Sequence, residues 1–277
     1  MFWQTTRFRI DLTRPQVMGI VNVTPDSFSD GGQSAHAAAA IRHCEQLIAE
    51  GADILDIGGE STRPGSAPVS AQEELGRVLP VLDAALTLGC PISVDTNKPE
   101  VMREVLARGA DVLNDIQALQ APGALDVVAT HPGAGLCLMH MRGDPLTMQQ
   151  RPRYDDVLAE VSAFLNERLH ACLARGVAAD RIVLDPGIGF GKSVEHNLAL
   201  LRRQRELLAL GRPLLLGWSR KSTLGAITGR DVSQRLAASV AAALAAVQAG
   251  ASVVRVHDVA ATVDALKVWA AAEPGRG

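Results

Sequence analysis

The sequence predicts an α/β fold, a single domain over residues 1–277 that forms a (β/α)8 TIM barrel with a parallel eight-stranded core and outer helices. Three observations support this prediction. Short apolar runs rich in β-branched residues recur eight times, amphipathic segments separate them, and several of these segments end just before a glycine, as at Gly51 and Gly250. Runs that are apolar on both faces are typical of parallel strands covered by helices, and eight such units close a barrel.

The predicted strands each end in a polar residue. In chain order they span residues 16–23, 53–59, 91–96, 110–116, 134–140, 181–187, 213–219 and 252–258. The predicted helices between them span residues 37–50, 71–88, 99–108, 154–175, 195–210 and 233–249. An open doubly wound sheet is the alternative, but it usually has fewer strands and often a G-x-G-x-x-G turn after the first strand, which is absent here. Because no linker rich in proline, serine or charge divides the chain, we expect one domain.

Composition narrows the class of protein. The 277 residues are 47% hydrophobic and 21% charged with a formal net charge of −3, which gives no global electrostatic reason to bind nucleic acid or an anionic membrane. The N-terminus lacks the apolar run of a signal peptide, and the most apolar stretch, residues 236–254, is too interrupted to span a membrane. The cysteines form no C-x-x-C pair. We expect them to be buried free thiols of a cytoplasmic protein; they are Cys44, Cys90, Cys137 and Cys172.

The candidate functional residues stand at the strand ends. In a barrel of this class the loops that follow the strands gather around one mouth, where the active site lies. The polar residues at these ends are Asn22, Asp56, Glu60, Asp95, Asn114, Asp115, His140, Asp185, Ser219, Arg220, Lys221, Arg255, His257 and Asp258. Any one of them could be a loop residue that meets water. An unpaired buried polar group costs several kcal/mol, so one shared polar pocket explains the whole set better.

The loops after the first two strands are long. Residues 22–32 and 58–66 carry glycines, hydroxyls and carboxylates, a composition that suits lids that order around a substrate. Plain turn chemistry is the alternative explanation. A turn, however, has no need of the cation that Arg63 places between Thr62 and Pro64.

The segment from Gly187 to Ser193 comes close to a phosphate-binding P-loop. The pattern G-x-x-x-x-G-K-[ST] requires a glycine five residues before Gly191, where this chain has Pro186. We therefore expect no nucleoside triphosphate site here. The close glycines are interpreted as letting the backbone turn beneath a bound ligand.

The chain resembles the dihydropteroate synthase family from Asn22 to Val259. The matching segments, in family order, are NVTPDSFSDGG, DIGGESTRPG, SVDTNKPEV, LNDI, LMHMRGDP, VLDPGIGFGK, SRKS and RVHDV. The resemblance implies a pterin-binding TIM barrel and a transferase of folate biosynthesis. That enzyme would condense para-aminobenzoate with 6-hydroxymethyl-7,8-dihydropterin diphosphate and release diphosphate. The resemblance also implies Mg²⁺, a homodimer, and sulfonamides as inhibitors of the family.

The resemblance further implies roles for individual residues. For the pterin it indicates Asp95, Asn114, Met139, Asp185, Phe190 and Lys221. For the diphosphate it indicates Asn22, Thr62, Arg255 and His257, with Asn22 also at the metal. For aminobenzoate it indicates Phe28, Thr62, Arg63, Pro64, Lys221 and Ser222, with Asp30 closing the first loop. The expected catalytic residues are Asp95, Asp185, Lys221 and Arg63.

The residue types fit these roles. The amino-pyrimidinone edge of a pterin pairs well with a carboxylate and an amide such as Asp185 and Asn114, although Asp185 could instead belong to a core ion pair. Arg255 and His257 alternate along the last predicted strand, so both point to one face as a cation and a hydrogen-bond donor for diphosphate. For His257 alone, a satisfied core histidine is the alternative.

Two other functions stay open. A pterin-binding methyltransferase shares the pterin groups, but it has no use for a diphosphate clamp such as Arg255 and His257. A catalytically silent paralogue would have eroded lid loops, and these are intact. Three departures from the family pattern are expected to leave the contact residues untouched; they are Asn97, Gln117 and Trp218.

Overall fold

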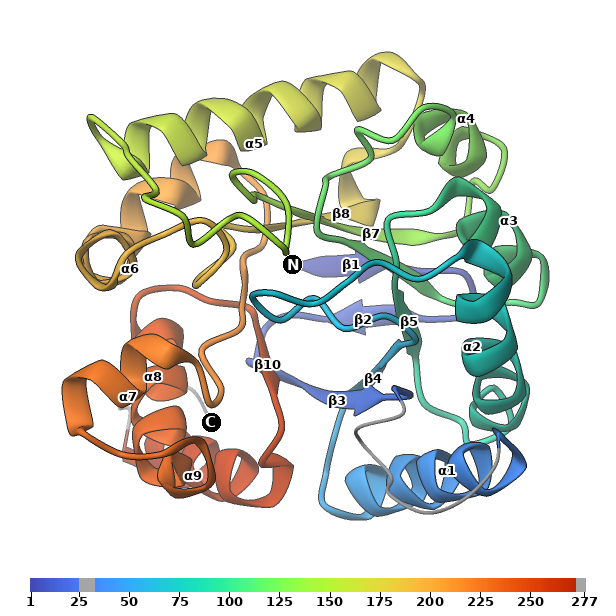
Figure 1. Cartoon of the computed structure of the whole chain (residues 1–277), viewed down its shortest axis with the longest axis horizontal. Helices are drawn as coiled ribbons and strands as arrows, with labels where there is room; N and C mark the ends of the chain where they lie inside the picture. The colour runs from blue at the N-terminus through green and yellow to red at the C-terminus, as the bar shows by residue number, and fades with distance from the viewer. Residues whose placement is uncertain (25–32, 273–277) are drawn as a thin grey trace.

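The computed structural model describes residues 1–24 and 33–272, which form a parallel barrel. Its eight strands pair in the order β8-β7-β6-β5-β4-β3-β10-β9. Figure 1 shows the strands at the centre of the molecule with helices around them. The sheet closes where Leu184 forms a parallel bridge with Leu214 and the Leu184 amide donates to the Pro213 carbonyl at 2.9 Å. The strands are β3 (Gln16–Asn22), β4 (Ile54–Gly58), β5 (Ile92–Asp95), β6 (Val112–Asp115), β7 (Gly135–Met139), β8 (Ile182–Asp185), β9 (Leu215–Leu216) and β10 (Val253–Val256). The predicted TIM barrel is confirmed.

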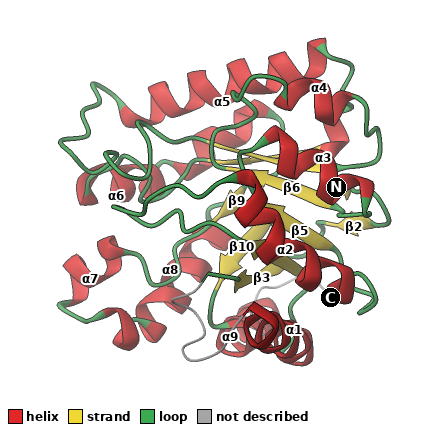
Figure 2. Cartoon of the chain, turned by 45° about the vertical axis from the view of Figure 1, so that its right-hand side comes forward, coloured by secondary structure: helices red, strands yellow, loops and turns green. Residues whose placement is uncertain are grey.

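Helices cover the outside of the sheet (Figure 2). They are α1 (Gln33–Ala49), α2 (Ala71–Ala85), α3 (Pro99–Ala107), α4 (Ala124–Ala129), α5 (Val157–Ala174), α6 (Val194–Arg202), α7 (Ser222–Thr228), α8 (Leu236–Gln248) and α9 (Val259–Ala272). Helices α4, α7 and α9 lie outside the segments predicted as helical. The segment predicted as one helix over 195–210 divides into α6 and a 3₁₀ segment (Gln204–Leu210). Gln204, the first residue of the 3₁₀ segment, is buried and donates to the Ala246 carbonyl at 2.8 Å.

A β-hairpin that the sequence analysis missed fills one end of the barrel. Its strands, β1 (Phe2–Gln4) and β2 (Arg9–Asp11), pair antiparallel, and Trp3 faces Ile10. Trp3 is fully buried, and its Nε1 donates to the Arg181 carbonyl at 2.9 Å. Both residues pack on side chains at or near the starts of the barrel strands, namely Met18, Ile54, Val112, Cys137, Val183, Leu215 and Val253. The hairpin therefore occupies the N-terminal end of the barrel and leaves the C-terminal end for a ligand.

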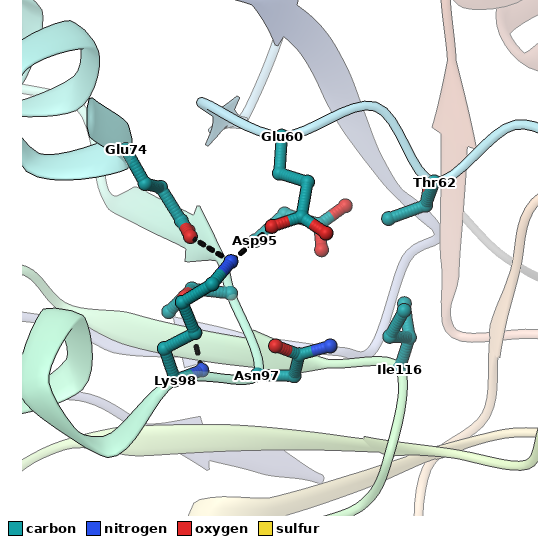
Figure 3. A pocket seen from close by; sticks show the side chains of 8 residues that line it. Glu60, Thr62, Glu74, Asp95, Asn97, Lys98 and Ile116 are labelled. Atoms are coloured by element: carbon teal, nitrogen blue, oxygen red, sulfur yellow. Dashed lines mark hydrogen bonds and ion pairs between the residues drawn. The ribbon is translucent and has the colours of Figure 1, made fainter. Parts of the chain in front are cut away.

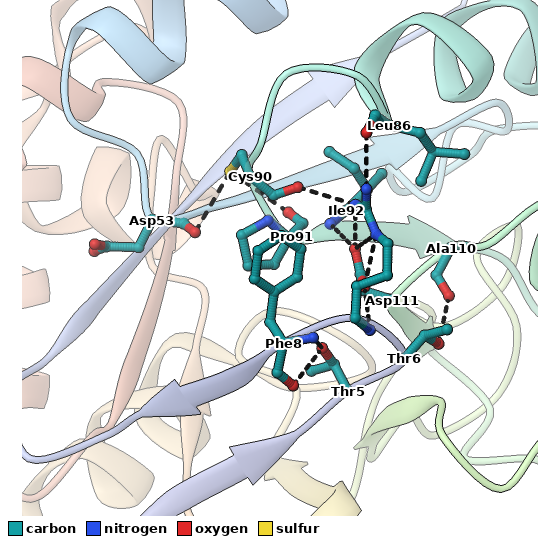
Figure 4. A network of polar contacts seen from close by, with 11 residues as sticks. Thr5, Thr6, Phe8, Asp53, Leu86, Cys90, Pro91, Ile92, Ala110 and Asp111 are labelled. Carbon is teal, nitrogen blue, oxygen red and sulfur yellow. Dashed lines mark hydrogen bonds and ion pairs between the residues drawn. The ribbon is translucent and has the colours of Figure 1, made fainter.

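Arg7, in the loop of this hairpin, is partly exposed and bonds the buried Asp111. Figure 4 shows the polar network around Asp111, between the hairpin and the barrel wall. The Nη2 of Arg7 donates to Oδ2 of Asp111 at 2.6 Å, and its Nη1 donates to the Leu86 carbonyl at 2.7 Å. Asp111 is fully buried and also accepts from the backbone amides of Arg7 and Ile92, at 3.0 and 2.9 Å. The guanidinium thus joins the hairpin to the barrel wall.

Arg7→Ala is expected to lower the free energy of unfolding by about 2–3 kcal/mol, because it removes charged hydrogen bonds from a fully buried carboxylate. Arg14→Ala is the matched control. Arg14 also bonds an aspartate, Asp53, but its side chain is 66% exposed, so its loss should stay within about 1 kcal/mol. Chemical denaturation followed by circular dichroism measures both variants, and equal losses would contradict the anchoring role of Arg7.

All four cysteines are free and buried. Burial raises the pKa of Cys44 and of Cys90 to about 12, so both stay protonated at neutral pH. Among the described residues, no helix has both the length and the apolar character needed to cross a membrane.

Candidate active site

Arg255 lies at the centre of a group of polar side chains in the barrel. Its Nε donates to Oδ2 of Asp56 at 2.6 Å, and its Nη2 donates to Oδ2 of Asp95 at 3.0 Å. The Nδ2 of Asn114 donates to the same Asp56 oxygen at 3.1 Å. These side chains come from β10, β4, β5 and β6. Four strands far apart in the sequence therefore deliver a cation, two carboxylates and an amide to one place.

This group keeps unused hydrogen-bonding capacity. Oδ1 of Asp56 is buried without a partner, and Nη1 of Arg255 bonds no atom of the described chain. Burial raises the pKa of Asp95 to about 7, and the positive charge of Arg255 opposes that rise. Because buried polar groups are normally paired, the unused donor and acceptor favour a site that a polar ligand completes.

Asp185 and Lys221 are two further charged groups, which act on each other electrostatically without a direct ion pair. Asp185 ends β8, and its Oδ1 accepts from the Gly187 amide at 2.7 Å. Lys221 precedes α7, donates through Nζ to the Ile188 carbonyl, and places that Nζ 4.6 Å from the centre of the Phe190 ring. Burial lowers the pKa of Lys221 to about 8 and raises that of Asp185, and the charge of each acts against the shift of the other. These residues thus combine two charges with an apolar ring.

The two groups are neighbours. A Cβ placed on Gly217 would lie 3.9 Å from the Cβ of Arg255 and 3.9 Å from the Nζ of Lys221. The negative charge of Asp185 also contributes to the raised pKa of Arg255. Met139, which is buried, stands beside Asp185 in the register of β7 and β8. Asp185 and Arg255 therefore belong to one barrel mouth, as the strand-end argument requires.

His257 supplies a neutral imidazole just beyond β10. Its Nδ1 lies 3.0 Å from Oγ of Ser219, and its backbone amide donates to the same hydroxyl at 3.1 Å. Burial lowers the pKa of His257 to about 3. Positive charges act in the same direction, including those of Arg255, Arg220 and Arg63. His257 is therefore a hydrogen-bonding group rather than a cation at pH 7, and the exposed Arg63 lies close enough to act on it.

An ion-pair cluster anchors the loop after β4 (Figure 3). Lys98 donates to Glu60 of that loop and to Glu74 of α2, the latter at 2.6 Å, and Glu74 is fully buried. The pocket beside the cluster is lined by Glu60, Thr62, Glu74, Asp95, Thr96, Asn97, Lys98 and Ile116. Thr62 and Asp95, predicted for different parts of the substrate, therefore share one pocket.

The remaining predicted residues have fewer contacts. Asn22 is half-buried at the end of β3, while Pro64 and Ser222 are exposed. Phe28 and Asp30 lie outside the described residues. The roles of all these residues stay predictions.

Sequence reasoning missed part of the site. Asp56 was grouped with the strand ends but given no role, although a carboxylate inside the otherwise apolar β4 was a usable signal. Glu74 and Lys98 were not considered, and only the burial of Glu74 in α2 reveals the pair. Asn97 lines the pocket that contains Thr62 and Asp95, and the expectation that it touches no contact residue stays a prediction.

Comparison with known proteins decides the family. A family model described as a pterin binding enzyme matches residues 18–257. A dihydropteroate synthase of Neisseria meningitidis serogroup B is 54% identical over 275 residues, covering 97% of this chain and 96% of that protein. The chain belongs to the dihydropteroate synthase family. Dihydropteroate synthases are transferases of folate biosynthesis, so the predicted enzyme class is confirmed.

Solved dihydropteroate synthases share the whole fold. The Xanthomonas albilineans enzyme with 4-aminobenzoic acid has a TM-score of 0.91 and 54% identity, covering 96% of each chain. The same enzyme with 7,8-dihydropteroate has a TM-score of 0.90 and 49% identity, covering 99% of this chain and 100% of that one. Family membership removes the methyltransferase alternative.

Proposed function

We propose that this dihydropteroate synthase joins para-aminobenzoate to 6-hydroxymethyl-7,8-dihydropterin diphosphate at the barrel mouth, by a dissociative substitution. The observation that carries the proposal is the meeting of Asp56, Asp95, Asn114 and Arg255 beside Asp185 and Lys221. The test is diphosphate release by the purified chain. Release must depend on both substrates, and release without aminobenzoate, or no release at all, would contradict the proposal.

The pterin fits between the two charged groups. Asp185 and Asn114 would pair with its amino-pyrimidinone edge and Asp95 with its ring nitrogens. Phe190 and Met139 would pack against its faces. Cleavage of the carbon–oxygen bond to diphosphate leaves positive charge on the pterin, and the carboxylates of Asp95 and Asp185 would stabilise it in the transition state.

The leaving diphosphate needs donors where its negative charge grows. The unused Nη1 of Arg255 is one such donor, and His257 and Thr62 would supply further hydrogen bonds. Closure of the loop after β4 would help to exclude water, which would otherwise capture the pterin cation. This chain forms no covalent bond to substrate in the proposed reaction.

Mg²⁺ fits beside this diphosphate position. The described residues contain no group of three or more His, Cys, Asp or Glu side chains able to hold a metal. Asn22 offers an amide oxygen at the end of β3, and its side chain bonds no other described residue. Since Mg²⁺ takes oxygen ligands from few protein groups together with substrate phosphates and water, Asn22 and the diphosphate suit it. When bound, the ion would supply positive charge to the leaving group.

Aminobenzoate is assigned to the loop after β4. We expect Arg63→Ala to raise the aminobenzoate KM by about tenfold, equal to about 1.4 kcal/mol of lost binding, and to slow coupling, because Arg63 would hold the ring with Thr62 and Pro64. The pterin diphosphate KM should stay within about twofold. Steady-state kinetics measure both KM values. Lys267→Ala, at an exposed position on α9, is the control. An unchanged aminobenzoate KM would remove Arg63 from the site.

The pKa of Lys221 predicts that activity falls at alkaline pH. Its pKa of about 8 leaves the ammonium charged at pH 7, and the charge is lost as the pH rises through that value. If the charged form binds substrate, kcat/KM falls about tenfold per pH unit above this point. Lys221→Arg keeps its charge there and should lose this limb while retaining measurable activity. The measurement is kcat/KM as a function of pH for wild type and Lys221→Arg. If both lose activity over the same alkaline range, the loss belongs to another group.

We further propose a cytoplasmic homodimer. The four free cysteines suit a reducing compartment. Helices α8 and α9 expose Leu236 and Val268, by 47% and 72%, which supports contact between outer helices of two copies. Light scattering at micromolar protein concentration measures the oligomeric state, and a monomer would contradict this proposal.

A further inference from the structure

Lys192 is a buried lysine that the proposed reaction does not use. It belongs to the segment that resembles a P-loop, yet it is only 2% exposed. Its Nζ lies 2.8 Å from Nδ1 of His140, and it donates to the carbonyls of Gly187 at 2.9 Å, Phe190 at 3.0 Å and His140 at 3.3 Å. Four acceptors are more than the N–H groups of a lysine side chain, which number three at most. Lys192 therefore holds its own loop and has no donor left for a phosphate.

The carbonyls of residues 187–191 all have side-chain donors. In chain order the donors are Lys192 for Gly187, Lys221 for Ile188, Gln149 for Gly189, Lys192 for Phe190 and Tyr154 for Gly191. Lys192 thus holds two carbonyls, and Lys221 holds one that lies between them. Two lysines, one inside the loop and one in the active site, therefore hold three of its five carbonyls.

The loop also packs against the backbone that follows β7. A Cβ on Gly187 would lie 1.8 Å from the His140 carbonyl oxygen, and a Cβ on Gly191 would lie 2.3 Å from the Arg142 carbonyl oxygen. Both glycines have positive φ, +67° and +64°. Lys192 stands at this contact, because it bonds His140 on one side and Gly187 on the other.

The same loop holds Lys221 in the pterin site. The stem of Lys221 packs on Gly189, where a Cβ would lie 3.0 Å from its Cδ. Its Nζ bonds the Ile188 carbonyl and lies over the Phe190 ring. A change in the curvature of the loop would therefore move two groups that are assigned to the pterin.

We propose that Lys192 is a positioning residue of the pterin site: from inside the loop it fixes residues 187–191, and through them Lys221 and Phe190. The proposal rests on the function proposed above, since it takes the pterin to be the ligand of this mouth. Lys192 itself makes no contact with substrate.

Lys192→Met tests the proposal, because methionine keeps the packing volume and removes the donor. We expect pterin diphosphate binding, measured by calorimetry, to weaken by about tenfold or more. In kinetics the pterin KM should rise more than kcat falls, with the aminobenzoate KM within about twofold. Tyr154→Phe is the matched control: it frees the Gly191 carbonyl at the far end of the loop and should stay within about threefold of wild type.

A double-mutant cycle with Lys221→Met separates positioning from a general structural role. Residues that act on one another show coupled effects, so in the Lys221→Met background Lys192→Met should weaken binding by less than about threefold. The proposal would be overturned by a full tenfold loss of binding in that background, or by wild-type affinity in Lys192→Met alone.

Should Lys192→Met fail to fold, Lys192→Arg replaces it. A planar guanidinium does not match this ring of acceptors, so wild-type affinity in Lys192→Arg would equally overturn the proposal. Wild-type enzyme that does not bind pterin diphosphate would instead contradict the proposed function.

Discussion

Asp185→Asn is expected to weaken the binding of pterin diphosphate by about 2–4 kcal/mol, a loss of about thirtyfold to a thousandfold in affinity. The amide oxygen of asparagine can still accept from the Gly187 amide, which Asp185 bonds at 2.7 Å, so the turn after β8 should survive. What is lost is the negative charge beside Lys221 and the pterin. Calorimetric titration with pterin diphosphate measures the effect.

Asp115→Asn is the matched control for this prediction. Asp115 is also a buried carboxylate at a strand end, but its two oxygens accept from the amides of Gln117 and Leu119, each at 2.7 Å. Its substitution should lower the free energy of unfolding while pterin affinity stays near that of wild type. Equal affinity in Asp185→Asn and wild type would show that Asp185 serves the core rather than the ligand.

Strong periodic signals made the barrel predictable. Each strand is apolar on both faces, so its position could be found without knowing its neighbours, and eight repeats left one closed arrangement. The fold then fixed the mouth, because parallel strands carry their C-terminal ends to the same side. Asp95, Asn114, Asp185 and Arg255 could be placed together on that argument alone.

The missed features depend on contacts between distant segments. The strands of the N-terminal hairpin, Phe2–Gln4 and Arg9–Asp11, have three residues each, too few to show a period, and their burial follows from the barrel they pack against. In the sequence Glu74 looks like any other acidic residue of a helix, and only the fold shows that Lys98 lies beside it. The role of Lys192 was equally hidden, since its acceptors on His140 are 52 positions away.

The largest stability effect is expected at Arg255. Arg255→Met should lower the free energy of unfolding at pH 8 by about 3–5 kcal/mol, because it leaves the fully buried Asp56 without a cation. It should also abolish measurable condensation, since a donor for diphosphate is lost. Arg220→Met is the control: the Arg220–Asp258 pair is nearer the surface, with Arg220 41% exposed, so its loss should stay within about 1 kcal/mol.

The pH dependence of this loss separates electrostatics from packing. Burial already raises the pKa of Asp95 to about 7, and removing Arg255 removes the charge that opposes the rise. A carboxyl group with a raised folded-state pKa destabilises the protein increasingly as the pH climbs from its unfolded value toward the folded one. The difference between wild type and Arg255→Met should therefore shrink between pH 8 and pH 5. Adding Asp56→Asn to Arg255→Met should restore part of the stability at pH 8, because it removes a buried charge without a partner. A pH-independent loss that Asp56→Asn leaves unchanged would mean that Arg255 stabilises the barrel by filling space rather than by neutralising the two carboxylates.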